Sequence, residues 1–445
     1  MRLLTTNLEA SQTSIPLSSL PKTFQDALIV VGWFGIKYLW IDALCIIQDS
    51  DDDWAHESGR MRDYYQYSFG TIAATGACNP SEGLFFDRNP AFVEPFRTLL
   101  SLEGEEQEVE VTAGGSCLET LRKEPLNQRG WFLQERFLSP RILHFGRSHM
   151  SWECRTELSC ETWPNIIPFH VYLSSSFGLK YDHRQMSHPL RQDTVIRGLW
   201  RNIVSTYSRM ALTRLSDRCV AFAGIAEEVQ AATQDVYVAG LWWGNLLEDL
   251  LWTVDVGFGE QRYPNDSLVR PQSYIAPSWS WLSINRPVKL PNFQNPVIQK
   301  MAVTKIEVES VTENKFGAIQ HGIISAWGAL IPAICTVGNG PWCFHSIGEW
   351  VGESNYWYSI CIDEGYNEEP DRSLYCLPIL EEVLENERYD QILGLLVVPT
   401  LKMTAQYRRI GAFEMDKSEA YKVLRVPGAL NDELNRAGFQ SFTLV

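Results

Sequence analysis

Asp42 is an acidic residue within an apolar segment, where burial of a charged side chain is unfavourable. It interrupts the apolar run from Tyr38 to Ile47, a run typical of a strand buried on both faces of a sheet. An ionised carboxylate in such a strand is unfavourable unless it is paired or hydrogen-bonded. Open α/β sheets bind ligands at the carboxyl ends of their strands, so Asp42 is a candidate to face a ligand cleft. The alternative is that it holds a neighbouring loop by accepting backbone N–H bonds, and both interpretations stay open.

The motifs of several common chemistries are incomplete in this sequence. The segment Gly146 to Met150 (GRSHM) lacks the final glycine of a nucleophile elbow. Gly338 and Gly340 are followed by proline, without the helix that would bind phosphate. There is no HExxH pair, and the eight histidines show no metal-ligand spacing. The sequence therefore predicts no zinc or other metal site, and no certain cofactor.

Composition limits the classes of partner. The chain has 445 residues, of which 45% are hydrophobic and 21% charged, which predicts a folded protein of more than one domain. Its net charge of -16 opposes binding to nucleic acid or to anionic lipid. Ten cysteines are scattered without a CxxC pair, which indicates free thiols in a reducing compartment, with Cys154 and Cys160 as structural residues.

A cytoplasmic location is expected. The segment from Met1 to Asn7 lacks the apolar core and cleavage site of a signal peptide. The segment from Ala27 to Ile47 has the length and apolar character of a membrane span, but Lys37 and Asp42 interrupt it, and each would cost about 3 kcal/mol at a bilayer centre. A buried helix followed by a buried strand accounts for the segment better.

Helical and strand patterns alternate in the first part of the chain. A helix is expected from the Leu20–Phe24 region to Phe34, stopped by Gly35, and the acidic residues 49–53 suit the start of another helix. Further expectations are a helix that carries Trp54, Met61 and Tyr65 on one face, strands at 71–74, 141–145 and 149–153, a hairpin near 98–113 and a helix at 127–138. This order predicts a parallel sheet flanked by helices.

The remaining chain changes character twice. Periodicity from about Leu199 to Asp255 is helical, with helices expected near 200–207, 221–229 and 241–252. Short alternating segments beyond residue 290, such as Ile306–Glu309 and Leu393–Val398, predict a β-rich region. We therefore divide the chain into an α/β domain at 1–165, a mainly helical middle region at 166–290 and a β-rich C-terminal domain at 291–445.

Three ordered blocks resemble the heterokaryon incompatibility (HET) domain of fungi. They are LPKTFQDA at 20–27 with YLWIDALCIIQD at 38–49, the residues Trp54, Glu57, Met61 and Tyr65, and RGWFLQERFLSP at 129–140 with WEC at 152–154. Downstream segments are also similar to such proteins, namely Leu212-Thr213, SDR at 216–218, GLW at 240–242 and APSWSW at 276–281. The family pattern usually opens with a strand carrying Leu-Ser-Tyr-x-Trp-Gly; the sequence starts after it, so we expect a HET domain whose first strand is missing.

The resemblance implies a chemistry. HET domains are thought to be distantly related to Toll/interleukin-1 receptor (TIR) domains, some of which cleave NAD with one glutamate that follows a tryptophan on a helix. Trp131 and Glu135 stand four apart, hence on one helical face. Glu135 is then the candidate catalytic residue, because a fixed carboxylate stabilises the positive charge that develops on the ribose as nicotinamide leaves.

Each of these residues also has a structural interpretation. Glu135 could pair with Arg129 or Arg136, and Trp131 could belong to the core instead of contacting nicotinamide. Arg129 could bind a phosphate or bridge to Glu135. Together with Asp42, Arg129 and Trp131 form the candidate NAD-binding set.

The resemblance implies fungal non-self recognition and regulated cell death, with NAD as the candidate substrate. The expected partners are other proteins of the incompatibility system and a second copy of the chain. Two alternatives stay open: a non-catalytic module that only oligomerises or binds partners, and an enzyme of small-molecule metabolism on the same scaffold. Whether the chain is an enzyme at all is left undecided by the sequence.

Overall fold

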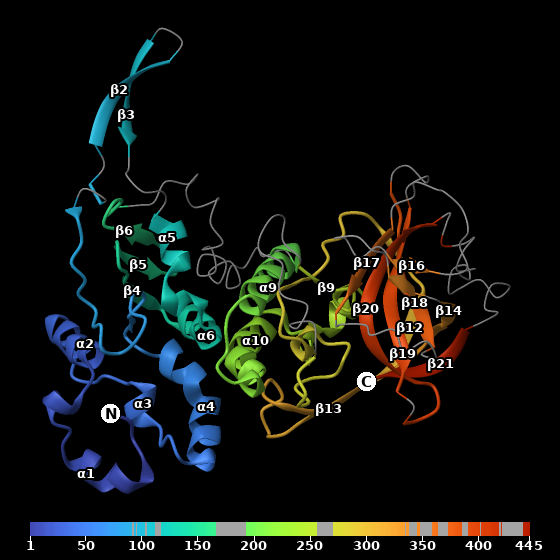
Figure 1. Ribbon diagram of the computed structural model, residues 1–445, viewed down its shortest axis with the longest axis horizontal. Coiled ribbons are helices and arrows are strands. Elements are labelled where there is room, and N and C mark those ends of the chain that lie inside the picture. Colours follow the sequence, from blue (N-terminus) through green and yellow to red (C-terminus); the bar gives the residue numbers. More distant parts are fainter. Residues whose placement is uncertain are drawn as a thin grey trace. The chain divides into compact units, whose positions relative to one another are not determined.

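The chain divides into two compact units (Figure 1). The N-terminal unit comprises Met1–Leu199, Met210–Thr213 and Val220–Ala232, and the C-terminal unit comprises Trp200–Arg209, Arg214–Cys219 and Thr233–Val445. The computed structural model describes residues 1–90, 93–94, 96–102, 105–111, 117–165, 193–255, 270–333, 335–337, 345–347, 358–363, 373–384, 390–400, 402–417, 420 and 439–445.

The N-terminal unit combines helices with one small mixed sheet. Its helices are α1 (Leu8–Thr13), α2 (Lys22–Trp33), α3 (Asp42–Cys45), α4 (Asp51–Gln66), α5 (Cys117–Lys123), α6 (Gly130–Leu138) and most of α10 (Val220–Thr233), with 3-10 turns at Thr5–Asn7, Leu17–Ser19 and Pro125–Gln128. Helix α9 (Asp193–Ser208) contributes to both units. Among the described residues, no helix has both the length and the apolar composition needed to cross a bilayer.

The sheet follows the order β1-β4-β5-β6. Its strands are β1 (Thr71–Ala73), β4 (Arg141–Phe145), β5 (Met150–Cys154) and β6 (Leu158–Cys160). Strands β1 and β4 are parallel, with Ile72 opposite Leu143, whereas β4, β5 and β6 are antiparallel. The predicted α/β class is therefore confirmed, although only one pairing is parallel. The expected hairpin is also present, as β2 (Phe96–Leu102) and β3 (Glu105–Val111).

Local signals explain where the first helices begin and end. Helix α2 follows Pro21 and buries Ala27 and Val30 in a cluster that includes Phe145 of β4. It ends before Gly35, whose φ of 65° is a left-handed conformation that glycine adopts without strain. Helix α4 begins after Ser50, whose side chain accepts a hydrogen bond from the backbone N–H of Asp53.

The strand expected from Tyr38 to Ile47 is wrong. Tyr38 is 89% exposed, and Asp42 opens the single-turn helix α3. The Asp42 carboxylate accepts a hydrogen bond from the backbone N–H of Ala43 at 2.7 Å, which competes with strand formation. Leu3 bonds to the carbonyl of Ala43 and to the N–H of Gln48, so the segment is held by the first residues of the chain.

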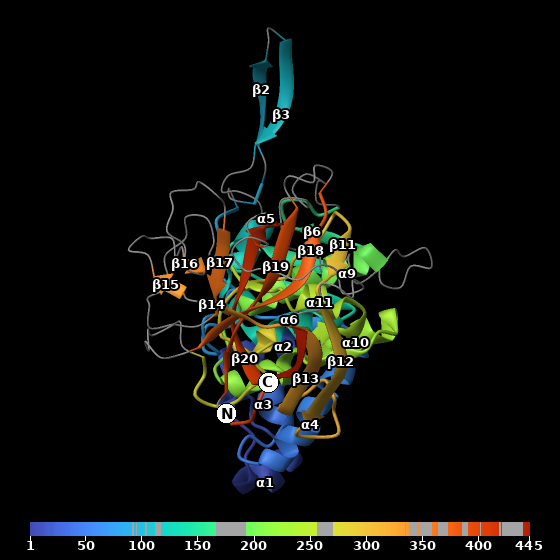
Figure 2. The same ribbon diagram turned by 90° about the vertical axis from the view of Figure 1, so that its right-hand side faces the viewer.

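The C-terminal unit contains a nine-stranded sheet within the described residues (Figure 2). The sheet is ordered β11-β18-β19-β20-β21-β13-β12, with β14 paired to β18 and β17 to β20. These strands are β11 (Val297–Gln299), β12 (Met301–Ser310), β13 (Ile319–Ala329), β14 (Ile331–Ala333), β17 (Tyr358–Ile362), β18 (Leu374–Glu382), β19 (Gln391–Pro399), β20 (Gln406–Asp416) and β21 (Phe439–Leu444). The β-rich character expected for this region is confirmed.

Smaller elements complete this unit. They are the strand pairs β7 (Tyr237–Val238) with β8 (Leu241–Trp242), β9 (Thr253–Val254) with β10 (Val288–Lys289) and β15 (Cys335–Val337) with β16 (His345–Ile347), the helix α11 (Leu246–Asp249), and 3-10 turns at Leu215–Arg218, Trp243–Asn245 and Trp281–Ser283. The expected helix at 241–252 is thus largely wrong, because a strand and a 3-10 turn occupy its first half. The three-domain division stays a prediction.

Candidate functional site

A cavity of about 630 Å³ lies within the N-terminal unit. Its wall is formed by α2, the segment 36–42, the last turn of α4, α6 and strands β1, β4 and β5. Most of the lining side chains are apolar. Its lining includes the polar and aromatic residues Trp40, Asp42, Tyr64, Tyr65, Glu135 and Arg141.

The start of α6 is fixed by a neighbouring segment of the same unit. The N–H of Gly130 donates to the carbonyl of Ala211 at 2.8 Å, and the N–H of Ala211 donates to the carbonyl of Gln128 at 2.7 Å. A Cβ atom on Gly130 would lie 2.7 Å from the Leu212 side chain, so a larger residue would require that side chain to shift. The helix that carries Glu135 is therefore held in place at its first residue.

A second anchor lies in the middle of α6. The Arg136 guanidinium donates two hydrogen bonds to the Glu153 carboxylate of β5, at 2.7 and 2.9 Å. Glu153 also lies 3.2 Å from His144 Nε2, and His144 Nδ1 lies 3.1 Å from the Thr75 hydroxyl. All four residues are buried. Arg136 thus pairs with Glu153, whereas a pairing of Glu135 with Arg136 stays a prediction.

Glu135 is a titratable group of the cavity with a strongly perturbed pKa. Burial raises the pKa of its carboxyl group from 4.5 to about 7, and the nearby negative charge of Asp42 contributes in the same direction. The positive charge of Arg129 and a hydrogen bond from the Tyr65 hydroxyl act in the opposite direction. At neutral pH, Glu135 therefore exchanges between its protonated and ionised forms, which is a property of many functional carboxyl groups.

Aromatic side chains surround this carboxyl group. The Trp40 ring stacks on Tyr64 with centroids 5.0 Å apart and meets the edge of Tyr65 at 5.8 Å. Burial raises the pKa of Tyr65 well above 10, and the charges of Glu135 and Asp42 raise it further. Tyr65 therefore stays protonated and serves as a hydrogen-bond donor to Glu135.

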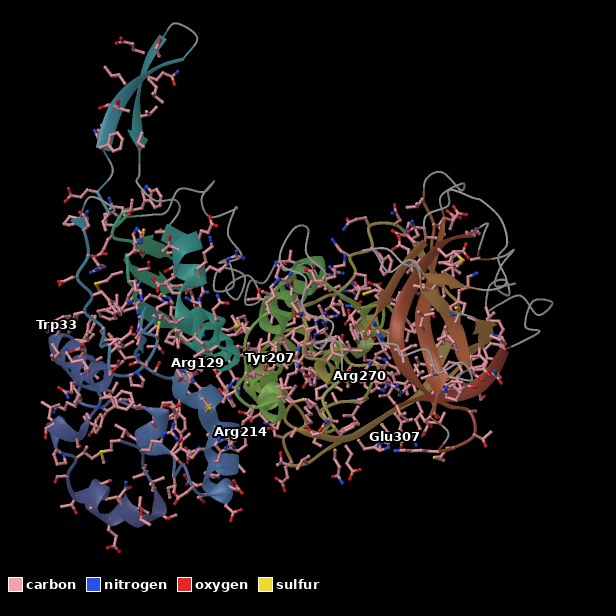
Figure 3. The ribbon with its side chains drawn as sticks, in the orientation of Figure 1. Trp33, Arg129, Tyr207, Arg214, Arg270 and Glu307 are labelled. Carbon is pink, nitrogen blue, oxygen red and sulfur yellow. The ribbon has the colours of Figure 1, made fainter. Side chains whose placement is uncertain are left out.

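The predicted site residues are only partly brought together. Asp42 and Glu135 both line the cavity, although Asp42 reaches it from α3 instead of a strand and is exposed. Arg129 is exposed at the N-terminal end of α6, within electrostatic range of Glu135 (Figure 3). Trp131 is half-buried and does not belong to the residues that line the cavity. The roles of these four residues stay predictions.

Sequence reasoning missed three contributors to the site. Tyr65 was assigned only to a helical face, yet its hydroxyl bonds Glu135. Trp40 was placed inside a strand, yet its ring is part of the cavity wall. Arg141 adds a cation to the wall, where its guanidinium donates to the carbonyl of Phe69 at 2.6 Å. The sequence signal for Trp40 and Tyr65 was weak: both residues belong to the family motifs, but nothing in the motifs indicates that the two side chains are in contact.

One comparison with known proteins gives a match. Residues 3–135 match the family model described as Heterokaryon incompatibility protein (HET), and the matched segment ends at Glu135. No curated protein and no solved structure shows a significant match to the chain.

Proposed function

Residues 3–135 form a heterokaryon incompatibility (HET) domain, and from this premise we propose that the chain acts in fungal non-self recognition and regulated cell death by cleaving NAD. The observation that carries the proposal is the position of Glu135. It is an anchored carboxyl group at the wall of a 630 Å³ cavity, a size within the range of small-molecule sites.

The proposed reaction is hydrolysis of the bond between nicotinamide and ribose. Nicotinamide leaves with the bonding electron pair, positive charge develops on the ribose, and water adds to the anomeric carbon to give ADP-ribose and a proton. The ionised Glu135 carboxylate stabilises that positive charge, as carboxylates do in glycosidases. Trp40, which lines the cavity, offers an aromatic ring to the nicotinamide or adenine ring. Arg129 and Arg141 are the cations suited to the pyrophosphate.

The neighbours of Glu135 tune its charge for this role. Tyr65 and Arg129 favour the ionised form, whereas burial and Asp42 favour the protonated form. Because the ionised form is the active one in this proposal, the rate of NAD cleavage rises as pH increases and levels off above about 7.

Release of nicotinamide from NAD by the purified full chain is the direct test. At pH 8 the wild type releases nicotinamide, and Glu135→Gln reduces the rate by about 10²- to 10³-fold, the usual loss when one charge-stabilising group is removed. The matched control is Glu119→Gln, which removes an exposed carboxylate on α5 that pairs with Lys123. The control keeps the wild-type rate.

Two outcomes would contradict the proposal. The first is a wild-type chain that is folded by circular dichroism and releases no nicotinamide between pH 6 and pH 8. The second is release that Glu135→Gln leaves unchanged. Expression of the same three proteins in a fungal host, with NAD and viability measured together, connects the chemistry to cell death.

Self-association without turnover is a second candidate function. Its support is a set of large apolar side chains exposed on and just after α2, with exposed fractions of 41% for Leu28, 48% for Ile29, 65% for Trp33 and 50% for Phe34 (Figure 3 labels Trp33). If assembly alone causes cell death, Trp33→Ser abolishes toxicity and Glu135→Gln does not. Toxicity lost in Glu135→Gln and kept in Trp33→Ser excludes this candidate.

A further inference from the structure

Two cysteines far apart in the sequence meet inside the N-terminal unit. Cys117 is the first residue of α5 and Cys160 is the last residue of β6. Their sulfur atoms lie 2.7 Å apart, and the two side chains are 1% and 4% exposed. Such a separation places the sulfurs in direct contact, which sequence spacing did not indicate.

The surroundings of the pair favour the thiolate form of Cys160. A hydrogen bond between the Cys117 and Cys160 sulfurs lowers the Cys160 pKa from 9.0 to about 7. Burial opposes this effect, whereas hydrogen bonds from the Thr162 and Trp163 backbone reinforce it. A substantial fraction of Cys160 is therefore ionised at neutral pH, and the thiolate is the nucleophilic form of cysteine.

Three other cysteines, Cys154, Cys219 and Cys361, do not combine a thiol of lowered pKa with a hydrogen bond to a second thiol. Cys219 is buried with its pKa raised to about 12, and Cys361 has its pKa raised to about 11, both mainly by burial. The pKa of Cys154 is lowered because hydrogen bonds from Thr156 and backbone groups outweigh burial, but the Cys154 sulfur bonds the Thr156 hydroxyl group and not a thiol. The 117–160 pair joins an acidic thiol to a second thiol within contact distance.

We propose that Cys117 and Cys160 are a site of reversible oxidation, at which a hydroperoxide converts the two thiols into a disulfide. The Cys160 thiolate attacks one peroxide oxygen, so an S–O bond forms, the O–O bond breaks and the leaving oxygen takes a proton to become water or an alcohol. Cys117, after losing its proton, attacks the resulting sulfenic acid. The S–S bond forms, the S–O bond breaks and the second oxygen leaves as water.

The bond would enclose the elements that carry the cavity. Residues 117–160 contain α5, α6, β4 and β5. They therefore include Glu135 and also Glu153, which holds α6 through Arg136. Oxidation joins both ends of this segment covalently, and a thiol reductant restores the two cysteines. The site thus couples the redox state of the surroundings to the segment that holds the candidate catalytic residue.

Peptide mapping of the purified full chain tests the proposal. Trypsin places Cys117 in the peptide 98–122, Cys154 in 148–155 and Cys160 in 156–180. After treatment of the native protein with hydrogen peroxide and blocking of the remaining thiols, we expect a linked pair of 98–122 with 156–180. Its mass is about 2 Da below the sum of the two peptides, because two hydrogens are removed. Dithiothreitol abolishes the linked pair.

Variants separate specific pairing from general oxidation. Cys154→Ser is the control and keeps the linked pair, whereas Cys117→Ser and Cys160→Ser lose it. Linkage through 148–155, or free alkylation of both Cys117 and Cys160 after peroxide treatment, overturns the proposal. The wild-type peptide map decides the question even if one of the serine variants fails to fold.

Discussion

Replacing Glu135 by glutamine should stabilise the N-terminal unit at alkaline pH. The Glu135 pKa is raised in the folded state, so the folded protein binds the carboxyl proton more tightly than the unfolded chain does. Stability therefore falls as pH rises from about 4.5 to about 7, where the folded state must give up that proton. Glutamine carries no ionisable proton and keeps nearly the same shape, so the variant escapes this loss.

The size of the effect follows from the two pKa values. A shift from 4.5 to about 7 corresponds to about 3 kcal/mol at pH 8, with 1.36 kcal/mol for each unit. At pH 5 less than about 1 kcal/mol of this cost is present, because the folded state keeps the proton and the pH lies only about half a unit above the unfolded pKa of 4.5.

Hydrogen exchange of α6 peptides in increasing urea reports on this unit alone. We expect the Glu135→Gln midpoint to exceed that of the wild type at pH 8 and to approach it at pH 5. Glu119→Gln, which alters an exposed carboxylate, should show no such gain. An equal difference at the two pH values, or no gain at pH 8, would refute the argument that the cavity holds Glu135 protonated.

Three other substitutions or treatments address the framework of the N-terminal unit. Glu153→Gln leaves the Arg136 charge buried without its carboxylate, and thermal unfolding should show a loss of about 3 to 5 kcal/mol. Gly83→Ala places a Cβ atom 2.4 Å from a neighbouring carboxylate oxygen at a residue with φ of 84°, so urea unfolding should reveal a cost of about 1 kcal/mol or more. Closing the 43-residue separation between Cys117 and Cys160 with a disulfide should add about 4 kcal/mol by chain entropy, seen as a higher melting temperature in peroxide than in dithiothreitol.

The sequence predicted the regular elements of the N-terminal unit where local signals agree. Helix α2 follows its proline start signal, helix α4 begins within the acidic stretch 49–53, and β4 and β5 lie within a residue or so of their predicted bounds. The prediction of a strand at residues 38–47 was wrong because it rested on the apolar run alone. Hydrogen bonds from Leu3 and the Asp42 side chain decide its conformation, and neither is visible in a periodic pattern.

The candidate site was predictable in its residues but not in its contacts. Glu135 and Asp42 were singled out from the sequence, and both line the cavity. Tyr65 belongs to a helix some seventy residues earlier in the chain, and nothing in the spacing shows that its hydroxyl meets Glu135. The contact between Arg136 and Glu153 could not be predicted either, because the two residues lie on different elements and only the fold of β5 brings Glu153 to the guanidinium.

The central place of β21 in its sheet has a consequence for synthesis on the ribosome. Strand β21 lies between β20 and β13, and its partner β13 is made more than a hundred residues earlier. Translation proceeds at about 5 to 20 residues per second, so the nascent sheet waits several seconds with the edges of β13 and β20 open. A premature stop codon before residue 439 would leave those two strand edges permanently unpaired. The truncated chain would then be prone to aggregation.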